Sequence, residues 1–242
     1  MKRLLRTLIL LLVRIIGAPG AFFAARRAQA PGKTPRILLV RPDHLGDMLL
    51  ATPVLDALKA QLPEAQITMM VGPWSSEIVA RHPAVDRLIS CPFPGFQRAP
   101  QKALAPYFLL FTVARNVRRQ HYDLAINLRP DFWWGAALLY LACIPRRVGY
   151  ALAPGKPFLT HALPFQSPEH ATRSNLRLAS AGLALLGAQP LPEHPLGELP
   201  GLGLRWLGHV HHHPVRRHAA GAFRGRARRR ADATDLPQRS GA

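Results

Sequence analysis

Four ionisable side chains lie within seven residues, directly after a short apolar run. The run is Ile-Leu-Leu-Val at residues 37–40, and Arg41, Asp43, His44 and Asp47 follow it. A run of this length and composition predicts a strand buried on both faces of a parallel sheet. The carboxyl end of such a strand is where open α/β sheets bind their ligands. In this position a carboxylate can accept a proton as a general base, and an arginine can hold an anion by paired charged hydrogen bonds.

Gly46 precedes Asp47, and we expect the chain to bend sharply there before a helical pattern resumes. A helix is predicted over residues 52–63, with Thr52 as its N-cap and Pro53 in its first turn. The helix can also begin at Asp47, with Pro53 as a kink.

Asp47 and Arg41 each have a second, purely structural interpretation. Asp47 can be an acidic residue that only stabilises the first turn of a helix. Arg41 can form a surface ion pair with Asp43 or Asp47 instead of binding a ligand.

Strands and helices alternate from residue 36 onwards. Further strands are predicted over residues 66–71, 85–91, 122–128 and, as the last one, 146–150, and further helices over residues 74–80, 104–119 and 132–142. A second polar turn, containing Arg129, follows the strand over residues 122–128. Repeated units of this size predict the α/β class, with a Rossmann-like parallel sheet and helices on both faces.

The net charge of +19 is concentrated at the two ends of the chain. Residues 1–36 carry eight basic residues and no acidic ones, and residues 205–242 carry nine Arg against two Asp. The body between them has the charge of an ordinary globular domain, so nucleic acid is not an expected partner. The two cysteines, Cys91 and Cys143, stand far apart, which argues against a disulfide framework and a zinc site.

Residues 1–30 are predicted to form a basic amphipathic helix. Its apolar half is expected to hold most of the large aliphatic residues, while Leu10 and Val13 share the other half with the basic ones. The apolar run at 8–13 is shorter than the roughly 20 residues that span a bilayer, which favours a helix lying on an anionic membrane surface. Two alternatives stay open. The helix can pack on its own domain, or it can be a signal peptide, although Arg14 and Arg26 stand where such a peptide should be uncharged.

Residues 191–242 are predicted to be a linker and a disordered, low-complexity tail. From residue 201 on, the chain has nine Arg and no Lys, and four clustered histidines: His209, His211, His212 and His213. Such a composition cannot bury enough apolar surface to fold. The tail can be a basic arm for nucleic acid or membrane, a metal chelator of undefined geometry, or the product of reading a G+C-rich gene out of frame.

Several motifs in order resemble glycosyltransferase family 9, which includes the ADP-heptose:lipopolysaccharide heptosyltransferases. They are the stretch 41–47 continuing to 51–53 and 58–59, then 122–128, 147–150, Glu169-His170, and Asn175-Leu176 with a leucine-rich helix up to residue 187. The resemblance covers residues 36–190. It implies a GT-B enzyme, in which two Rossmann-like domains face each other, the first binding a lipid-linked sugar acceptor and the second a nucleotide-sugar donor.

The resemblance also implies roles for particular residues. Asp47 matches the family's aspartate, the general base of an inverting heptose transfer from ADP-heptose to the lipopolysaccharide inner core. The implied acceptor-binding residues are Arg41, Asp43, His44, Gly46 and Arg129. ADP-heptose is a substrate, and neither a cofactor nor a metal is expected.

The resemblance leaves the second domain unaccounted for, because residues 191–242 do not show its pattern. We therefore expect residues 36–190 to be the acceptor-binding domain of a truncated enzyme, inactive alone unless a partner supplies the donor half. The expected location is the cytoplasm, peripheral to the inner membrane. The alternative is a non-enzymatic Rossmann-like module that binds a membrane or nucleic acid through its basic ends.

Overall fold

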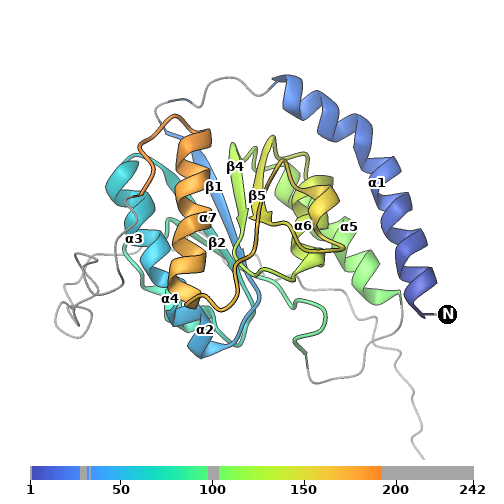
Figure 1. Cartoon of the computed structure of the whole chain (residues 1–242), viewed down its shortest axis with the longest axis horizontal. Helices are drawn as coiled ribbons and strands as arrows, with labels where there is room; N and C mark the ends of the chain where they lie inside the picture. Colours follow the sequence, from blue (N-terminus) through green and yellow to red (C-terminus); the bar gives the residue numbers. More distant parts are fainter. Residues whose placement is uncertain (1, 28–31, 33, 98–103, 192–242) are drawn as a thin grey trace, which may run out of the picture. The chain divides into compact units, whose positions relative to one another are not determined.

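The computed structural model describes residues 2–27, 32, 34–97 and 104–191. Within this part of the chain, six parallel strands form one sheet in the order β3-β2-β1-β4-β5-β6 (Figure 1). The strands are β1 (Arg36–Arg41), β2 (Gln66–Val71), β3 (Arg87–Ser90), β4 (Leu124–Asn127), β5 (Arg146–Tyr150) and β6 (His161–Leu163). The predicted α/β class is confirmed. Of the linker and tail predicted over residues 191–242, residues 192–242 lie outside the described residues.

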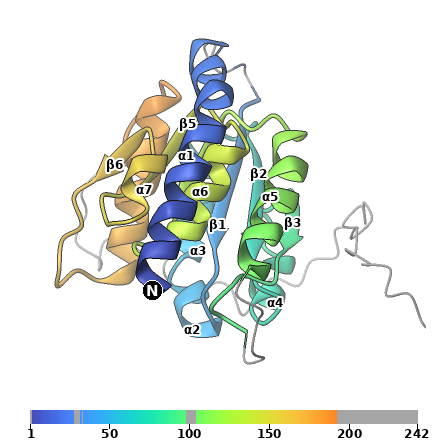
Figure 2. The ribbon, with the colours of Figure 1, turned by 90° about the vertical axis from the view of Figure 1, so that its right-hand side faces the viewer.

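Helices cover both faces of the sheet. They are α1 (Lys2–Arg27), α2 (Leu45–Leu49), α3 (Thr52–Gln61), α4 (Ser76–Ala80), α5 (Ala105–Arg118), α6 (Trp133–Leu141), the 3-10 turn η1 (Lys156–Phe158) and α7 (Ala171–Leu185). Figure 2 shows α5 and α6 on one face, with α1 outside α6, and Figure 1 shows α3 and α7 together on the other face. The described part of the chain is therefore layered as the alternating pattern predicts.

Alternating side chains of β1 supply both hydrophobic cores. Leu38 and Val40 belong to the core under α5 and α6, while Ile37 and Leu39 belong to the core under α3 and α7. All four side chains are fully buried. A strand between two helical layers has no polar face, and this explains why its sequence is a continuous apolar run rather than an alternating one.

Two expectations about the chain's course are wrong in detail. The strand at 146–150 is not the last one, because β6 follows it and pairs with β5 in parallel. Three residues are too few to show a periodic pattern. The helix predicted over residues 52–63 is present as α3, but its N-cap is Ala51 and not Thr52, and a separate short helix, α2, occupies the position of Asp47. Pro53 lies in the first turn of α3, where its missing N–H costs nothing.

Helix α1 packs on α6 of its own domain. Leu10 and Val13 are buried in the core shared with α6, and the Tyr140 hydroxyl donates a 2.8 Å hydrogen bond to the carbonyl of Arg14. A Cβ placed on Gly17 would lie 2.3 Å from the Tyr140 ring, so the two helices approach closely at this glycine. Packing on its own domain, one of the alternatives for this segment, is therefore what the structure shows.

The face of α1 that contacts the domain is not the predicted apolar half. Leu10 and Val13, which the pattern placed among the basic residues, are buried, whereas large aliphatic residues of the apolar half are exposed: Leu8, Leu11, Leu12, Ile15 and Ile16. Residues 6–26 of this helix also meet the length and composition of a membrane span, a test that core helices and signal sequences pass as well.

We expect the buried His82 to make folding stability depend on pH. The ring is 2% exposed, and its Nδ1 accepts a 3.2 Å hydrogen bond from the backbone N–H of Ala84. Burial lowers the pKa of His82 below the ordinary value of 6.5, although the charge of Asp56 opposes this. The unfolded chain therefore binds a proton near pH 6.5 that the folded chain does not, and stability should fall as the pH drops below 6.5, by at most about 1.4 kcal/mol per pH unit.

Urea unfolding at pH 7.5 and at pH 5.5 measures this loss. His82→Asn, which cannot titrate, should be less stable at both pH values but lose less between them, while the exposed His161→Asn should behave like the wild type. An unchanged pH dependence in His82→Asn contradicts the assignment.

Candidate active site

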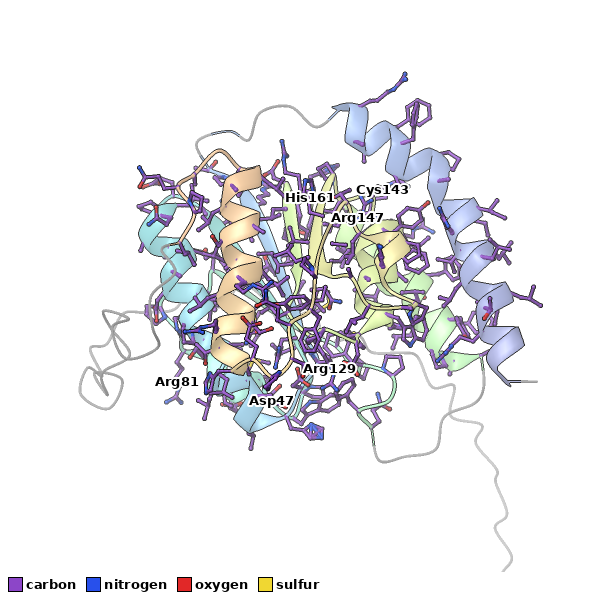
Figure 3. The ribbon with its side chains drawn as sticks, viewed as in Figure 1. Asp47, Arg81, Arg129, Cys143, Arg147 and His161 are labelled. Carbon is purple, nitrogen blue, oxygen red and sulfur yellow. The ribbon has the colours of Figure 1, made fainter. Side chains whose placement is uncertain are left out.

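Two polar turns meet at the carboxyl edge of the sheet. One follows β1 and the other follows β4, and the two strands are direct neighbours, with Val40 opposite Asn127. The chain runs outward from β1 through β2 to β3, and then crosses back to β4, so the strand order reverses between β1 and β4. This switch point is the usual ligand-binding position of an open parallel sheet. Figure 3 shows Asp47 and Arg129 at this edge, with Cys143 and His161 at the opposite one.

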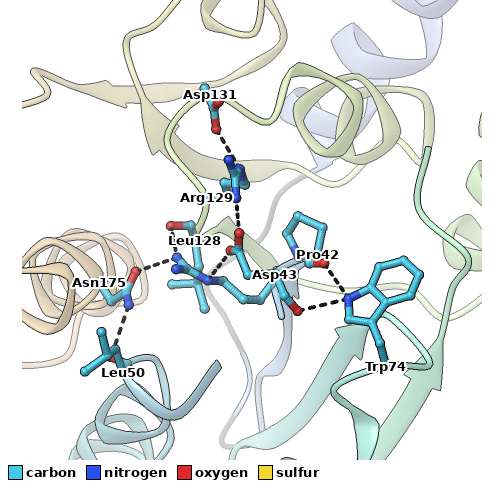
Figure 4. A network of polar contacts seen from close by, with 9 residues as sticks. Pro42, Asp43, Leu50, Trp74, Leu128, Arg129, Asp131 and Asn175 are labelled. Carbon is cyan, nitrogen blue, oxygen red and sulfur yellow. Dashed lines mark hydrogen bonds and ion pairs between the residues drawn. The ribbon is translucent and has the colours of Figure 1, made fainter. Parts of the chain in front are cut away.

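A buried carboxylate joins the two turns (Figure 4). Asp43 is 1% exposed and forms an ion pair of 2.6 Å with Nε of Arg41. Its other oxygen accepts a short hydrogen bond from Nη1 of Arg129, whose Nε donates to Asp131 at 2.7 Å. A carboxylate out of contact with water is tolerated only with such partners. Asp43 therefore holds the β1 and β4 turns together.

The two arginines differ in their electrostatic surroundings. Burial lowers the pKa of Arg41, and the negative charges of Asp43 and Asp47 oppose this. Burial acts in the same direction on Arg129, but its hydrogen bonds and charge interactions with Asp131 and Asp43 outweigh it and raise the pKa of this guanidinium. Both side chains are cationic at neutral pH, because arginine does not lose its proton in proteins.

Arg41 is anchored by the protein itself. Its Nη1 donates to the carbonyl of Leu128 at 2.8 Å and to Oδ1 of Asn175 at 3.1 Å. Asn175 then donates to the carbonyl of Leu50, next to α2, at 3.2 Å. With 5% exposure, Arg41 links β1 to the β4 turn, α7 and the end of α2. The ion pair of Arg41 with Asp43 is present, but it is buried and not at the surface as considered. This geometry fits a positioning role better than direct contact with a ligand.

Asp47 is an exposed carboxylate of the site. It lies in the first turn of α2, and its side chain makes no hydrogen bond or ion pair among the described residues. A Cβ on Gly46 would meet nothing within 4 Å, so the approach to the neighbouring carboxylate is open. The bend expected at Gly46 is wrong, because this glycine lies inside α2 and has no left-handed φ. The chain turns at residues 42–44, where Pro42 cannot continue the ladder of β1.

Aromatic rings line the same edge. The exposed His44 stands edge-to-face on Trp74 at 5.6 Å, and Trp74 stacks on Phe96 at 6.1 Å between ring centroids. The indole N–H donates to the carbonyls of Pro42 and Asp43 at 3.0 and 3.1 Å. Arg129 lies over the Phe96 ring at 5.1 Å.

The sequence reasoning gave Trp74, Phe96 and Asn175 no place in the site. The sequence could have predicted the two aromatic residues. Trp74 follows β2 and Phe96 follows β3, and the carboxyl ends of parallel strands lie at the same edge of a sheet. Asn175 lies on α7, far along the chain, and only the packing of α7 brings it to Arg41.

All the predicted site residues gather at this one edge. Asp43 and Arg129 touch each other, Arg41 touches Asp43, and His44 and Asp47 are exposed beside them. A cavity of about 620 Å³ lies elsewhere, between the end of α1 and the loop before β5. Over the described residues no group of three or more His, Cys, Asp or Glu side chains could hold a metal ion.

The fold and this edge define a class of domain, a Rossmann-like α/β domain with an open acidic and basic site at its switch point. No family model matches the chain. The chain is 31% identical over 116 residues to the lipooligosaccharide heptosyltransferase 2 of Haemophilus ducreyi, covering 48% of this chain and 30% of the relative. It is 29% identical over 138 residues to the lipopolysaccharide heptosyltransferase 3 of Escherichia coli K12, covering 54% and 38%.

Solved structures with the same fold include a glycosyl transferase family 9 protein from Veillonella parvula, with a TM-score of 0.52, 23% identity, and coverage of 66% of this chain and 44% of that one. The E. coli heptosyltransferase WaaC, solved with ADP, gives a TM-score of 0.53, 20% identity, and coverage of 66% and 49%. The chain resembles lipopolysaccharide heptosyltransferases in sequence and a glycosyl transferase family 9 structure in fold, and it spans about a third of the length of the curated relatives it matches.

Proposed function

We propose that residues 36–190 are the acceptor-binding domain of an inverting GT-B heptosyltransferase, which transfers heptose from ADP-heptose to the lipopolysaccharide inner core. One observation carries the proposal, the exposed carboxylate of Asp47 at the switch point of the sheet, which has no hydrogen bond or ion pair within the described part of the chain. The relatives are named as heptosyltransferases, and one solved relative holds ADP, which supports the substrate class.

The proposed chemistry assigns Asp47 the role of general base. An acceptor hydroxyl attacks the anomeric carbon of the heptose, the bond from that carbon to the diphosphate oxygen breaks, and ADP leaves with the bonding electrons. Asp47 takes the hydroxyl proton, and the configuration at the anomeric carbon is inverted. Base assistance of this kind contributes about 10²–10⁴ in rate. ADP-heptose is bound by a second domain, as the family resemblance implies.

The buried ion cluster has a positioning role in this scheme. Asp43, Arg41 and Asn175 tie the β1 turn to Leu50, and Leu50 follows directly after the helix that bears Asp47. Fixing both ends of this segment holds the carboxylate in one place, and such positioning is a large part of catalysis by proximity. His44 and the guanidinium of Arg129, which is partly exposed, are the proposed contacts to the acceptor.

Binding of a deacylated, water-soluble Kdo oligosaccharide to the full chain tests the acceptor assignment without any membrane. We expect saturable binding by isothermal titration calorimetry, weakened about tenfold in His44→Ala, which is the loss of one good contact or about 1.4 kcal/mol. His161→Ala is the matched control, because His161 is exposed at the opposite edge of the sheet (Figure 3).

A chain that does not bind the oligosaccharide contradicts the proposal. If it instead shifts DNA in a salt-sensitive way that depends on residues 201–242, the binding-module alternative replaces it.

A further inference from the structure

We propose that α1 and α5 together form a surface that docks on an anionic lipid bilayer, with α1 lying flat in the interface. The inference does not rest on the transfer reaction proposed above, and its test contains no sugar. It starts from the unusual composition of α1, which is apolar on two opposite faces.

The inner face of α1 is small and is used by the domain. Gly17 meets Tyr140, Gly20 lies against Cys143, and Leu10 and Val13 are buried. The outer face is large, apolar and open to solvent, with more than half of each side chain exposed: Leu8, Leu11, Leu12, Ile15, Ile16, Phe22 and Phe23. A helix that is apolar all round is normally covered on all sides, and an exposed apolar patch of this kind marks an interaction surface.

Helix α5 extends the same surface. Ile16 of α1 and Phe111 of α5 line one groove between the two helices. Phe108, one turn before Phe111, is 71% exposed, and Leu104 just before α5 is 50% exposed. Figure 2 shows α1 and α5 on the same face of the sheet. We call the exposed apolar residues of α1 and α5, with Leu104, the α1/α5 surface.

Charge identifies the partner. Neither residues 2–27 nor residues 104–119 contain an acidic residue. Among the residues of these segments whose side chains are described, the exposed arginines are Arg6, Arg14, Arg26, Arg115, Arg118 and Arg119. An apolar helical face with basic residues and no acidic ones matches the surface of a membrane with anionic lipids. A second copy of this chain would bring the same positive charges together, which disfavours self-association through this surface.

The packing of α1 sets its orientation. A spanning helix would have to leave α6 and give up the buried contacts of Leu10 and Val13 and the hydrogen bond from Tyr140. A helix that stays on α6 can only lie parallel to the bilayer. In Figures 1 and 2, α1 runs alongside the strands, with its amino terminus toward the edge that carries Asp47. The site edge would then open sideways along the membrane surface, where a lipid-linked molecule can reach it.

Fluorescent labels on single introduced cysteines test the inference in the full chain. Leu8→Cys, Ile15→Cys, Phe22→Cys and Phe108→Cys are labelled with an environment-sensitive dye in a Cys143→Ser background. Cys91 stays unlabelled, because it is buried and burial raises the pKa of its thiol to about 12. Phe165→Cys is the control, an exposed aromatic residue outside the α1/α5 surface.

With phosphatidylcholine vesicles that contain phosphatidylglycerol, we expect a several-fold rise in emission at all four positions and none at Phe165. Lipid-bound quenchers should place residues 8, 15 and 22 at one shallow depth. Vesicles of phosphatidylcholine alone should give a much smaller rise. The label positions separate contact by α1 from any binding by the basic residues beyond 191.

Each other result overturns the inference. Depths that differ by about 21 Å between residues 8 and 22 indicate a spanning helix. A response in α1 without one at Phe108 indicates that α1 leaves the domain. No response at any position, or an equal response without phosphatidylglycerol, excludes an anionic bilayer as the partner. Labels shielded before vesicles are added, in a chain that sediments as a dimer, identify a second copy as the occupant.

Discussion

Replacing Asp43 with Asn should lower the free energy of unfolding by about 3–5 kcal/mol. The amide keeps the shape of the side chain but removes its charge, so the buried Arg41 loses its ion-pair partner and the half-buried Arg129 keeps only the exposed Asp131. Breaking a buried ion pair by removing one partner is costly for this reason. Native domains are stable by only about 5–15 kcal/mol, so the variant should be close to unfolding at 37 °C.

Urea unfolding followed by circular dichroism measures the loss. Asp131→Asn is the matched control, because Asp131 also pairs with Arg129 but its side chain is 66% exposed. An exposed pair contributes about 0–1 kcal/mol, so this variant should unfold close to the wild type. Equal stability of Asp43→Asn and Asp131→Asn would show that the cluster does not hold the two turns together.

Replacing Asp47 with Asn should lower heptose transfer by about 10²–10⁴ while leaving the fold intact. The carboxylate makes no hydrogen bond or ion pair among the described residues, so removing its charge costs little folding stability. What is lost is its interaction with the start of α2, about 0.3–1 kcal/mol, and its attraction to the charge of Arg41. The two interpretations of Asp47 are therefore separable, because a residue that only stabilises a helix would leave the rate unchanged.

Transfer from ADP-heptose to a Kdo-lipid acceptor is followed for the chain alone and for the chain mixed with the donor half of E. coli lipopolysaccharide heptosyltransferase 2. Glu64→Gln is the control, since Glu64 is also an exposed carboxylate but precedes β2, at the opposite edge of the sheet. A rate in Asp47→Asn within twofold of the wild type would remove Asp47 from the reaction.

The sequence alone predicted the α/β class and most strands, because each central strand is a continuous apolar run that only a two-sided core explains. The strands at 66–71 and 146–150 have the predicted bounds. The sequence also predicted that Arg41, Asp43, His44 and Asp47 lie together, because all four fall within seven consecutive residues. Arg129 was the one predicted site residue from a different strand.

Only the tertiary structure decided which of these residues contact each other and which are buried. Asp43 is buried between Arg41 and Arg129 because β1 pairs with β4. Asn175 reaches Arg41 because of the way in which α7 packs on the sheet.

The packing of α1 was also decided by the tertiary structure. The sequence determined that it is a helix with apolar and basic residues, but its apolar residues extend all the way round. Periodicity could not tell which side faces the domain. Gly17 and Gly20 decide that, because the absence of a Cβ lets the helix approach α6 and leaves the bulky face outside.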